Sequence, residues 1–520
     1  MAFLLLECEE AVAQGQSQRA FCREAGIARS TLRDAAEREV VVDAPDATVA
    51  FFTSPEGQVL LRRFVFAAHF VITLLGCGGI QLVCTLLRLS GLAPFVGSSY
   101  GAQHRINTSL LEHLGAFGQA EQQRLGATMP KKKIWLCEDE TFFPRMVLVA
   151  LDALSGFILV ERFAERRDEA TWTSKVCGAL RGLPVEVLGV TSDQAKGIVA
   201  HARKALCVSV TPDLFHFQHE FSGVCCAPLA SGVRALERAL TEAQERGHDK
   251  QGRDDVQVNQ ALAVAREWQE RMGAVLEATS EATHPYELYT GESRSGPQVD
   301  AELNEMLDEA EFLADEAQLP EASYTAIAKS RRAIKAMAAS VTGFHSRVNL
   351  ALAQLSMPPA LERAMKERVL PALYMEAAAD RSRESETRKR LHESAKTLVA
   401  PLHDKESGPL AELSEACVRY LLEQGKEWVS WYVRASSCVE GRNGQLSLHH
   451  HSLHILSDAK LAALTVMHNF WIQRADGTVA AERFFEQRPR DVFDWLLDVM
   501  ADLPYPAQKR PRVAHSPLLN

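Results

Sequence analysis

The sequence has no excess of positive charge, since 57 lysine and arginine residues are outnumbered by 67 aspartate and glutamate residues and the net charge is −10. This balance excludes a protein that binds nucleic acid through its overall charge, so any such site must be local. The 11 cysteines include no Cys-x-x-Cys spacing. That argues against the common zinc frameworks and against a small disulfide-stapled fold. We therefore expect reduced thiols in the cytoplasm.

The chain also lacks the basic segment that opens a signal peptide, and its first residues, MAFLLLECEE, turn acidic after a short apolar run. Residues 64–87 contain no Asp, Glu, Lys or Arg and are long enough to cross a bilayer. However, His69 and Gln81 are polar, and the glycines between Gly76 and Gly79 divide the stretch into two shorter apolar runs. We predict a buried helical hairpin and no membrane span.

Hydrophobic residues make up 47% and charged residues 24% of the 520 residues, as in soluble globular proteins. A chain of this length is expected to form about three domains. Changes in composition and hydrophobic period predict six regions along it. They are a helix-turn-helix at 14–40, a helical domain at 51–130, the first part of an α/β core at 131–221, a helical insertion at 222–432, the final core helix at 433–475, and a helix with a basic tail at 476–520.

The first of these regions has the pattern of a helix-turn-helix. Ser17 can cap one helix, Gly26 can form the turn, and a second helix can follow. From Ser17 to Arg33 there are four arginines and one glutamate. The side chains predicted to enter a DNA major groove are Arg29, Ser30, Thr31 and Arg33. The alternative is a plain helical hairpin on the surface.

The central region predicts an α/β core. From Ile134 the chain reads IWLCEDETFF and then RMVLVALDALSGFILVERF, with a turn signal at Ser155 and Gly156. These runs predict three strands, the last two forming a hairpin. A helix (ATWTSKVCGALRGL), a strand (PVEVLGVTSD), a helix (QAKGIVAHARKAL) and a short strand (CVSV) follow. The predicted order is βββαβαβ, and the helical spacing of residues 222–432 then predicts an all-α block.

Three acidic residues stand out by their positions. Asp139 is predicted to end the first strand, Asp193 to end the fourth, and Glu440 to begin a final helix after the helical block. This strand order, with acids at these places, is the topology of ribonuclease H-like nucleases and transposases, in which strands one and four are neighbours. Three converging carboxylates suit Mg²⁺ or Mn²⁺ better than zinc.

The motifs that carry a family resemblance occur in a fixed order along the chain. They are DET at 139–141, LDALSGFIL at 151–159, TSDQAKGI at 191–198, PDLFHF at 212–217 and VEGRNGQLSL at 439–448. With them the chain resembles bacterial insertion-sequence DDE transposases and related transposase-like proteins, from the helix-turn-helix to about Glu482. The 247 residues between Asp193 and Glu440 exceed what one strand and a connection need, but they match transposases with a helical insertion before the final helix.

The resemblance implies a ribonuclease H-like catalytic core, interrupted by a large all-α insertion and preceded by an all-α helix-turn-helix region. It implies catalytic and metal-binding roles for Asp139, Asp193 and Glu440, with Mg²⁺ or Mn²⁺ as the cofactor. The implied activity is binding of the ends of a mobile element, DNA cleavage and strand transfer. The expected partners are element and target DNA and further copies of the chain, in the cytoplasm and away from membranes.

Each assignment has an alternative. Glu140 is the next candidate after Asp139, although alternation along a strand would place it and Glu138 on the other face. Asp193 could instead be merely the cap of the following helix, and Asp213 would then be the alternative metal ligand. Glu440 could be an ordinary acid in the first turn of a helix. Asp152 is expected at a turn or strand end.

Several other polar and aromatic residues are weaker candidates. The histidines from His449 to His451 point in different directions on a helix, so we do not expect a metal cluster there. Packing or hydrogen bonding is the default for the remaining side chains, although a functional role is open for each. They are His216 and His219 for the site, Trp428 and Trp431 for stacking on a base, and Arg442 and Lys196 for phosphate contacts.

Two other functions fit part of the pattern. A catalytically idle, transposase-derived DNA-binding or scaffold protein would retain the helices but leave the acids without a role. A ribonuclease H-like nuclease acting on RNA–DNA hybrids or junctions would explain the acids. It would leave the helix-turn-helix and the insertion without a purpose.

Overall fold

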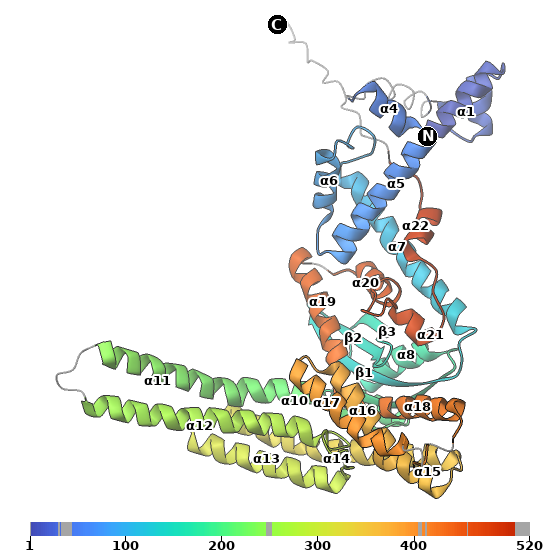
Figure 1. The fold of residues 1–520 in the computed structure, drawn as a ribbon. Helices are drawn as coiled ribbons and strands as arrows, with labels where there is room; N and C mark the ends of the chain where they lie inside the picture. Colours follow the sequence, from blue (N-terminus) through green and yellow to red (C-terminus); the bar gives the residue numbers. More distant parts are fainter. Residues whose placement is uncertain are drawn as a thin grey trace. The chain divides into compact units, whose positions relative to one another are not determined.

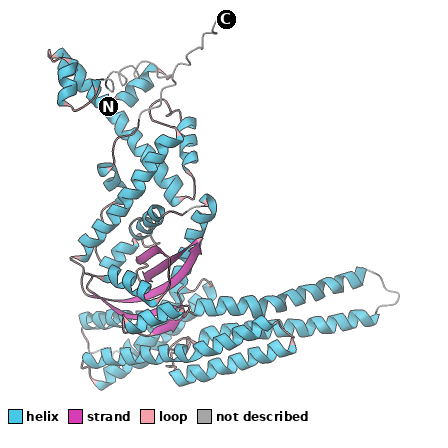
Figure 2. Cartoon of the chain, turned by 180° about the vertical axis from the view of Figure 1, so that it is seen from behind, coloured by secondary structure: helices cyan, strands magenta, loops and turns pink. Residues whose placement is uncertain are grey.

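The computed structural model describes residues 2–29, 32, 44–245, 252–403, 408–410, 413–454 and 456–504. Internal contacts divide the chain into two compact units. Unit 1 consists of residues 1–128 and 444–520, and unit 2 consists of residues 129–443. One sheet stands among many helices in the described part of the chain (Figure 2), so the protein is a helix-rich α/β protein.

The sheet belongs to unit 2 and has five strands in the order β3-β2-β1-β4-β5 (Figure 1). The strands are β1 (Lys132–Phe143), β2 (Arg145–Asp152), β3 (Ile158–Ala164), β4 (Val185–Ser192) and β5 (Val210–Pro212). β2 is antiparallel to both β1 and β3, whereas β4 is parallel to both β1 and β5. With α8 (Glu169–Leu180) between β3 and β4 and α9 (Lys196–Lys204) between β4 and β5, the predicted order βββαβαβ is confirmed.

The first strand ends at Phe143, as the run IWLCEDETFF predicts, but Asp139 does not lie at its end. β1 continues to Phe143 because it pairs with β2 along its whole second half. Its pairing with β4, however, stops at Cys137. Asp139 therefore lies just beyond the part of β1 that β4 covers, on a stretch with a strand on one side only.

A tryptophan fixes the register of β1 against β4. The ring of Trp135 lies over Gly189 of β4, where an added Cβ would come within 2.5 Å of the ring. Its Nε1 donates to Thr191 Oγ1 at 2.8 Å. The register shifts by one residue beside it, between Ile134 and Trp135. Glycine at 189 thus leaves the space that lets the indole reach the carboxyl end of β4.

A helical block follows the sheet in the chain and forms the rest of unit 2. Its helices are α10 (Leu214–Phe221), η2 (Ser222–Cys226), α11 (Ala227–Glu245), α12 (Gly252–Ala282), α13 (Gly296–Glu316), α14 (Glu321–Gln354), α15 (Pro359–Ala364), η3 (Met365–Val369), α16 (Leu370–Arg381), α17 (Ser385–Val399), η4 (Ala400–His403) and α18 (Glu415–Ser430). α11 pairs with α12 and α13 with α14 as long hairpins (Figure 1). The predicted all-α character of this block is confirmed over its described residues.

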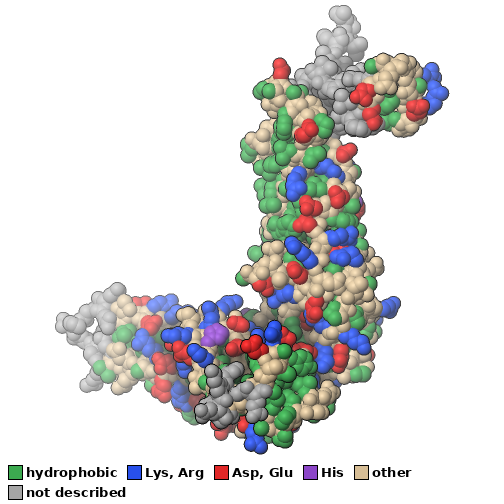
Figure 3. All heavy atoms as spheres, turned by 45° about the vertical axis from the view of Figure 1, so that its right-hand side comes forward, with side chains coloured by type: hydrophobic (Ala, Val, Ile, Leu, Met, Phe, Trp, Pro, Cys, Tyr) green, Lys and Arg blue, Asp and Glu red, His purple; other side chains and the backbone are tan. Residues whose placement is uncertain are grey.

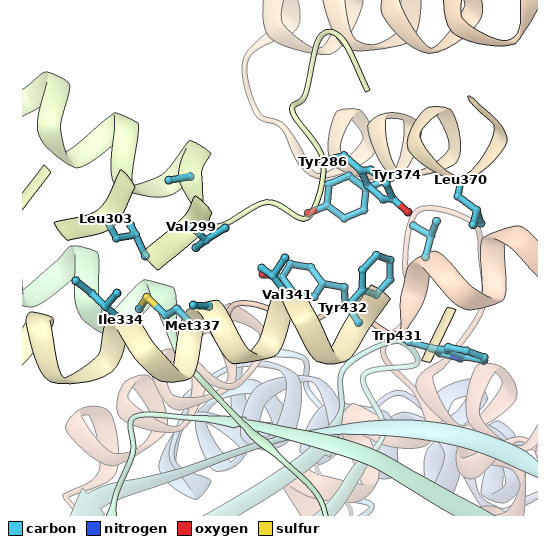
Figure 4. Packing of buried hydrophobic residues seen from close by; sticks show 14 of the residues in the cluster. Tyr286, Val299, Leu303, Ile334, Met337, Val341, Leu370, Tyr374, Trp431 and Tyr432 are labelled. Atoms are coloured by element: carbon cyan, nitrogen blue, oxygen red, sulfur yellow. The ribbon is translucent and has the colours of Figure 1, made fainter. Parts of the chain in front are cut away.

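The core of the block is apolar and rich in aromatic rings (Figure 4). Tyr286, Phe344, Tyr374 and Tyr432 are buried and pack ring against ring, with centroids 5.4 to 6.4 Å apart. Two of the buried hydroxyls have partners, since Tyr432 donates to the Thr283 carbonyl at 2.5 Å and Tyr374 contacts His284 at 2.7 Å. On the visible outer face, acidic and basic side chains are interspersed (Figure 3). Exposed pairs of this kind contribute little stability, so packing of the core holds the block together.

Unit 1 is helical. Its elements are α1 (Ala2–Ala13), α2 (Gln18–Glu24), α4 (Asp46–Thr53), α5 (Pro55–His69), η1 (Phe70–Leu75), α6 (Ile80–Leu89), α7 (Tyr100–Gly126), the later part of α19 (Ser437–Leu453), α20 (Asp458–Phe470), α21 (Ala480–Phe485) and α22 (Val492–Val499). The helix expected near residues 492–500 is α22. The basic tail at Lys509, Arg510 and Arg512 lies outside the described residues.

The long uncharged stretch forms the predicted helical hairpin. α5 and η1 run to Leu75, and α6 starts at Ile80 after the glycine-rich turn. Within the described residues, 55–75 is the one helix long and apolar enough to cross a membrane, with a mean hydropathy of 1.5 and 44% of its most apolar window buried. Its polar side chains have partners on α7. His69 Nε2 lies 2.7 Å from Gln103 Oε1, and Thr73 Oγ1 donates to Asn107 at 3.1 Å.

The first half of the predicted helix-turn-helix is described. Ser17 caps α2 by accepting from the backbone N–H of Ala20 at 3.2 Å, and Gly26 makes the turn with φ +66°. Arg29 is exposed, whereas Leu32 is buried with Cys8 and Cys22. The other residues predicted to contact DNA, Ser30, Thr31 and Arg33, lie outside the described residues.

In unit 1 a buried carboxylate joins α7 to the carboxyl-terminal segment. Glu121 is fully buried and accepts from the Nε and the backbone N–H of Arg490 at 2.7 and 2.8 Å and from Arg124 Nε at 3.1 Å. Burial alone would raise the pKa of Glu121, but the hydrogen bonds from Arg124 and Arg490 outweigh it and lower the pKa below its ordinary value of 4.5.

Glu121→Gln should therefore lower the free energy of unfolding near pH 7 by about 1.5–3 kcal/mol, the usual contribution of hydrogen bonds to a charged group. Because the pKa is lower in the folded state, this stabilisation is complete above pH 4.5 and is lost as the pH falls through the folded-state pKa. Urea unfolding of both proteins over a pH series measures the difference. Glu112→Gln, on the exposed side of α7, is the control, and an equal effect of both substitutions would contradict the role of Glu121.

Candidate functional site

Two of the predicted acids and one histidine lie together in unit 2, and the third acid lies beside the histidine. Asp139 of β1, Asp193 after β4 and His216 of α10 each place one oxygen or nitrogen within 4.8 Å of those of the other two. Glu440, in the first turn of α19, lies next to this group, with its Oε1 3.6 Å from His216 Nδ1. Side chains from β1, the turn after β4, α10 and α19 are thus close to one another.

Asp139 is the buried member of the group. Its side chain accepts from Asn443 Nδ2, on the second turn of α19, at 2.8 Å, and only 6% of the residue is exposed. Burial, with smaller contributions from Glu440 and Asp193, raises the pKa of Asp139 to about 7, although a hydrogen bond from the Glu140 backbone and the nearby His216 lower it. The ionised form of Asp139 is therefore unfavourable in this buried position unless a cation compensates its charge.

The neighbours of Asp139 face the other side of the sheet, as alternation along the strand predicts. Glu138 is fully buried, with its Oε1 3.7 Å from Nε2 of His201 on α9. Burial raises the pKa of Glu138 to about 8. Glu140 accepts from the Trp172 indole and from Arg167, each at 3.2 Å. Neither glutamate belongs to the group around Asp139.

Asp193 lies with Asp139 and also stabilises the turn before α9. It directly follows β4, is exposed, and takes part in the group with Asp139. Its Oδ1 accepts from the backbone N–H of Ala195 at 2.9 Å, although α9 itself begins without a side-chain cap. The intervening Gln194 has φ +69°, which turns the chain sharply after the strand. One side-chain oxygen is thus held by the backbone while the carboxylate remains open to solvent.

Glu440 reaches the site because the chain returns to the sheet after the helical block. We call residues 433–436 the return segment. Its backbone oxygens accept from Thr191 Oγ1 at 2.8 Å and from the backbone N–H of Leu214 at 3.0 Å. At its end, Ser436 donates to Asp213 from its N–H at 2.8 Å and from its hydroxyl at 2.6 Å. α19 begins at the next residue, so these bonds fix where Glu440 lies.

Asp213 also holds the histidine. It caps α10 by accepting from Phe215 N–H at 3.0 Å, and its Oδ2 lies 2.9 Å from His216 Nδ1. This hydrogen bond raises the pKa of His216 to about 9, with further contributions from Asp139 and Glu440. Burial would raise the pKa of Asp213, but its bonds with His216 and Ser436 lower it instead. Asp213 therefore holds His216 and the start of α19 in place through its hydrogen bonds.

Arg442 is not placed to contact a phosphate, contrary to our expectation. Its guanidinium donates to both oxygens of Glu161 on β3 at 2.7 Å, and 3% and 0% of the two side chains are exposed. The pair fastens α19 to the sheet. Lys196 is exposed at the start of α9 and stays a candidate.

The other weaker candidates are mostly structural. Trp428 and Trp431 are 3% and 5% exposed in the core of the helical block, so packing is confirmed as their role. Among the described residues, the group with Asp139 is the one set of His, Cys, Asp and Glu side chains arranged to hold a metal. The run from His449 to His451 is not part of this group. The network that links Asp213 to Ser436, and the donor Asn443, were not expected from the sequence.

If Arg442 is structural, replacing it should destabilise the protein. Arg442→Met leaves Glu161 buried without its guanidinium and should lower the free energy of unfolding by about 3–5 kcal/mol. Adding Glu161→Leu should recover part of this stability, because both charges are then removed. Urea unfolding of the four combinations measures the coupling. A drop in DNA affinity at unchanged stability would instead favour the phosphate contact.

The fold and the site define a helix-rich α/β protein with a carboxylate and histidine cluster beside the carboxyl ends of its parallel strands. Residues 365–512 match a family of unknown function (DUF6399). This match covers less than half of the chain and includes Glu440 and Asn443, but it begins after the sheet and after both Asp139 and Asp193. No curated protein and no solved structure matches the chain.

Proposed function

We propose that the protein is a DDE transposase that binds the ends of a mobile element and catalyses metal-dependent DNA cleavage and strand transfer. The observation that carries this proposal is the grouping of Asp139 and Asp193 with His216, together with the position of Glu440 beside that histidine. Glu440 follows Asp193 by 247 residues. A purely structural use of these acids gives no reason for the third to return to the first two.

The topology supports a ribonuclease H-like core. In that fold the first and fourth strands are neighbours, and here β1 and β4 are parallel neighbours at the centre of the order β3-β2-β1-β4-β5. The helical block then corresponds to the insertion found before the last helix of such enzymes. α19 corresponds to that last helix and carries Glu440 in its first turn.

The donor set fits a hard divalent cation. Carboxylate oxygens are the ligands that Mg²⁺ and Mn²⁺ prefer, and Asp139, Asp193 and Glu440 supply three carboxylates. Burial raises the pKa of Asp139, because the surroundings supply too little positive charge to stabilise the ionised carboxylate. When bound, Mg²⁺ or Mn²⁺ would activate water for attack on a phosphodiester and stabilise the developing charge. Asn443 orients the Asp139 carboxylate for this role through their hydrogen bond.

Removing one of the three acids should abolish cleavage but not DNA binding. We expect Asp139→Asn, Asp193→Asn and Glu440→Gln each to lower metal-dependent strand cleavage by about 100-fold or more, because each removes a charge from the reacting centre. Affinity for the element ends should change little, since phosphate attraction depends on other surfaces. Gel-based cleavage and fluorescence anisotropy on the same labelled fragment measure the two properties.

Glu138→Gln is the matched control. It is adjacent to Asp139 but faces the other side of the sheet, and its raised pKa of about 8 means that it is mostly protonated at pH 7. The amide therefore resembles the wild-type side chain in charge and shape, and cleavage should stay near wild type. Wild-type cleavage in any of the three acid variants would remove that acid from the proposed site. Cleavage absent from the wild type, with element ends still bound, would favour the idle scaffold.

The DNA-binding role of the amino-terminal helices has a separate test. If Arg29 and Arg33 contact phosphates, replacing both by alanine should weaken binding and make the slope of log affinity against log salt shallower by about 0.9 for each phosphate that is no longer neutralised. Thermal stability should barely change, because exposed substitutions move it by about 0.5 kcal/mol or less. Arg23→Ala, on exposed α2, is the control. An unchanged slope would leave the DNA to other basic surfaces.

A further inference from the structure

We propose that His216 is a fourth protein ligand of the metal and binds it through Nε2, with Asp213 as the carboxylate that orients the ring. The inference rests on the proposed function, because it concerns the same site. A nitrogen of His216 lies within 4.8 Å of oxygens of Asp139 and Asp193. The histidine thus occupies the same small space as the two acidic ligands.

The hydrogen bond to Asp213 decides which nitrogen is available. An ionised carboxylate only accepts hydrogen bonds, so His216 Nδ1, at 2.9 Å from Asp213 Oδ2, must carry the hydrogen and donate. A metal that displaces the proton from the other nitrogen then finds the lone pair on Nε2. Histidines that bind metals commonly donate their other N–H to a carboxylate, which fixes the tautomer and strengthens the ligand.

Asp213 is itself fixed in place and cannot readily replace His216. It is 3% exposed and accepts from Phe215 N–H, Ser436 N–H, Ser436 Oγ and His216 Nδ1. With both oxygens already used in this way, its carboxylate serves as a rigid support for the imidazole. The same residue thereby sets the positions of His216 on α10 and of Glu440 on α19.

A nitrogen ligand changes the expected metal preference. Carboxylates alone suit Mg²⁺, whereas imidazole suits transition metals and is a poor ligand for Mg²⁺. A site with three carboxylates and one imidazole should therefore bind Mn²⁺ more tightly than Mg²⁺. Replacing His216 should weaken Mn²⁺ binding more than Mg²⁺ binding, which a purely structural role of the ring would not produce.

The test uses the full-length, untagged protein with Mn²⁺ alone as the probe. The electron paramagnetic resonance signal of free Mn²⁺ gives the Kd of Mn²⁺ for the protein. Pulsed electron paramagnetic resonance of the bound Mn²⁺ detects ¹⁴N coupling from a coordinated imidazole. We expect ¹⁴N coupling in the wild type, and in His216→Ala the disappearance of this coupling with a Kd weaker by about 10–100-fold. Competition by Mg²⁺ should become more effective in His216→Ala. His219→Ala, on the same helix, is the matched control and should match the wild type.

The outcomes separate this inference from the proposed function. Mn²⁺ binding that Asp139→Asn abolishes, without ¹⁴N coupling in the wild type, would overturn the role of His216 and leave the acid site standing. Coupling that disappears in His216→Ala, in a protein that never cleaves DNA, would support the ligand and reject the transposase. If His216→Ala does not fold, absence of coupling in the wild type still overturns the inference, and coupling that disappears in Asp139→Asn supports it.

Discussion

Asp213 accepts hydrogen bonds from both the N–H and the hydroxyl of Ser436, and these bonds join parts of the chain that are 223 residues apart. The helical block lies between them in the sequence, so its two ends are held at the same corner of the sheet. The return segment adds bonds to Thr191 and Leu214. Without this connection the block could still pack around its aromatic core, but the placement of α19 beside the sheet would rest on the bonds of Arg442 to Glu161 and of Asn443 to Asp139. The position of the third acid therefore depends on residues that lie outside the group around Asp139.

The two faces of the sheet give the neighbouring acids Asp139 and Glu138 different electrostatic surroundings. On one face, burial raises the pKa of Asp139, the nearby carboxylates of Glu440 and Asp193 also raise it, and His216 lowers it. On the other face, burial keeps Glu138 largely neutral at pH 7. A single strand thus carries two buried acids on opposite faces. The first is the proposed metal ligand, whereas the second lies next to His201.

Much of the sheet could be predicted from the sequence, because runs of Val, Ile, Leu and Phe with clear turn signals specify strands locally. The predicted position of Asp139 at the end of β1 was wrong, because the pairing with β2 continues past this residue to Phe143. Arg442 was also misjudged. A lone arginine after a catalytic candidate favours a phosphate contact, and only the fold places Glu161 of β3 beside it. The bond between Asp213 and Ser436 has no local signal at all, because its partners meet only after the block has folded.

The place of the return segment in the chain has a consequence for protein synthesis. The sheet and both aspartates are complete by residue 213, whereas the return segment and Glu440 follow the whole helical block. A chain that is still being made, or that ends early inside the block, can therefore form the sheet but not the full group of acids. Contacts between such distant residues also tend to form late in folding. Only a chain that extends beyond the return segment can bring Glu440 to the two aspartates, so shorter products would lack the complete group.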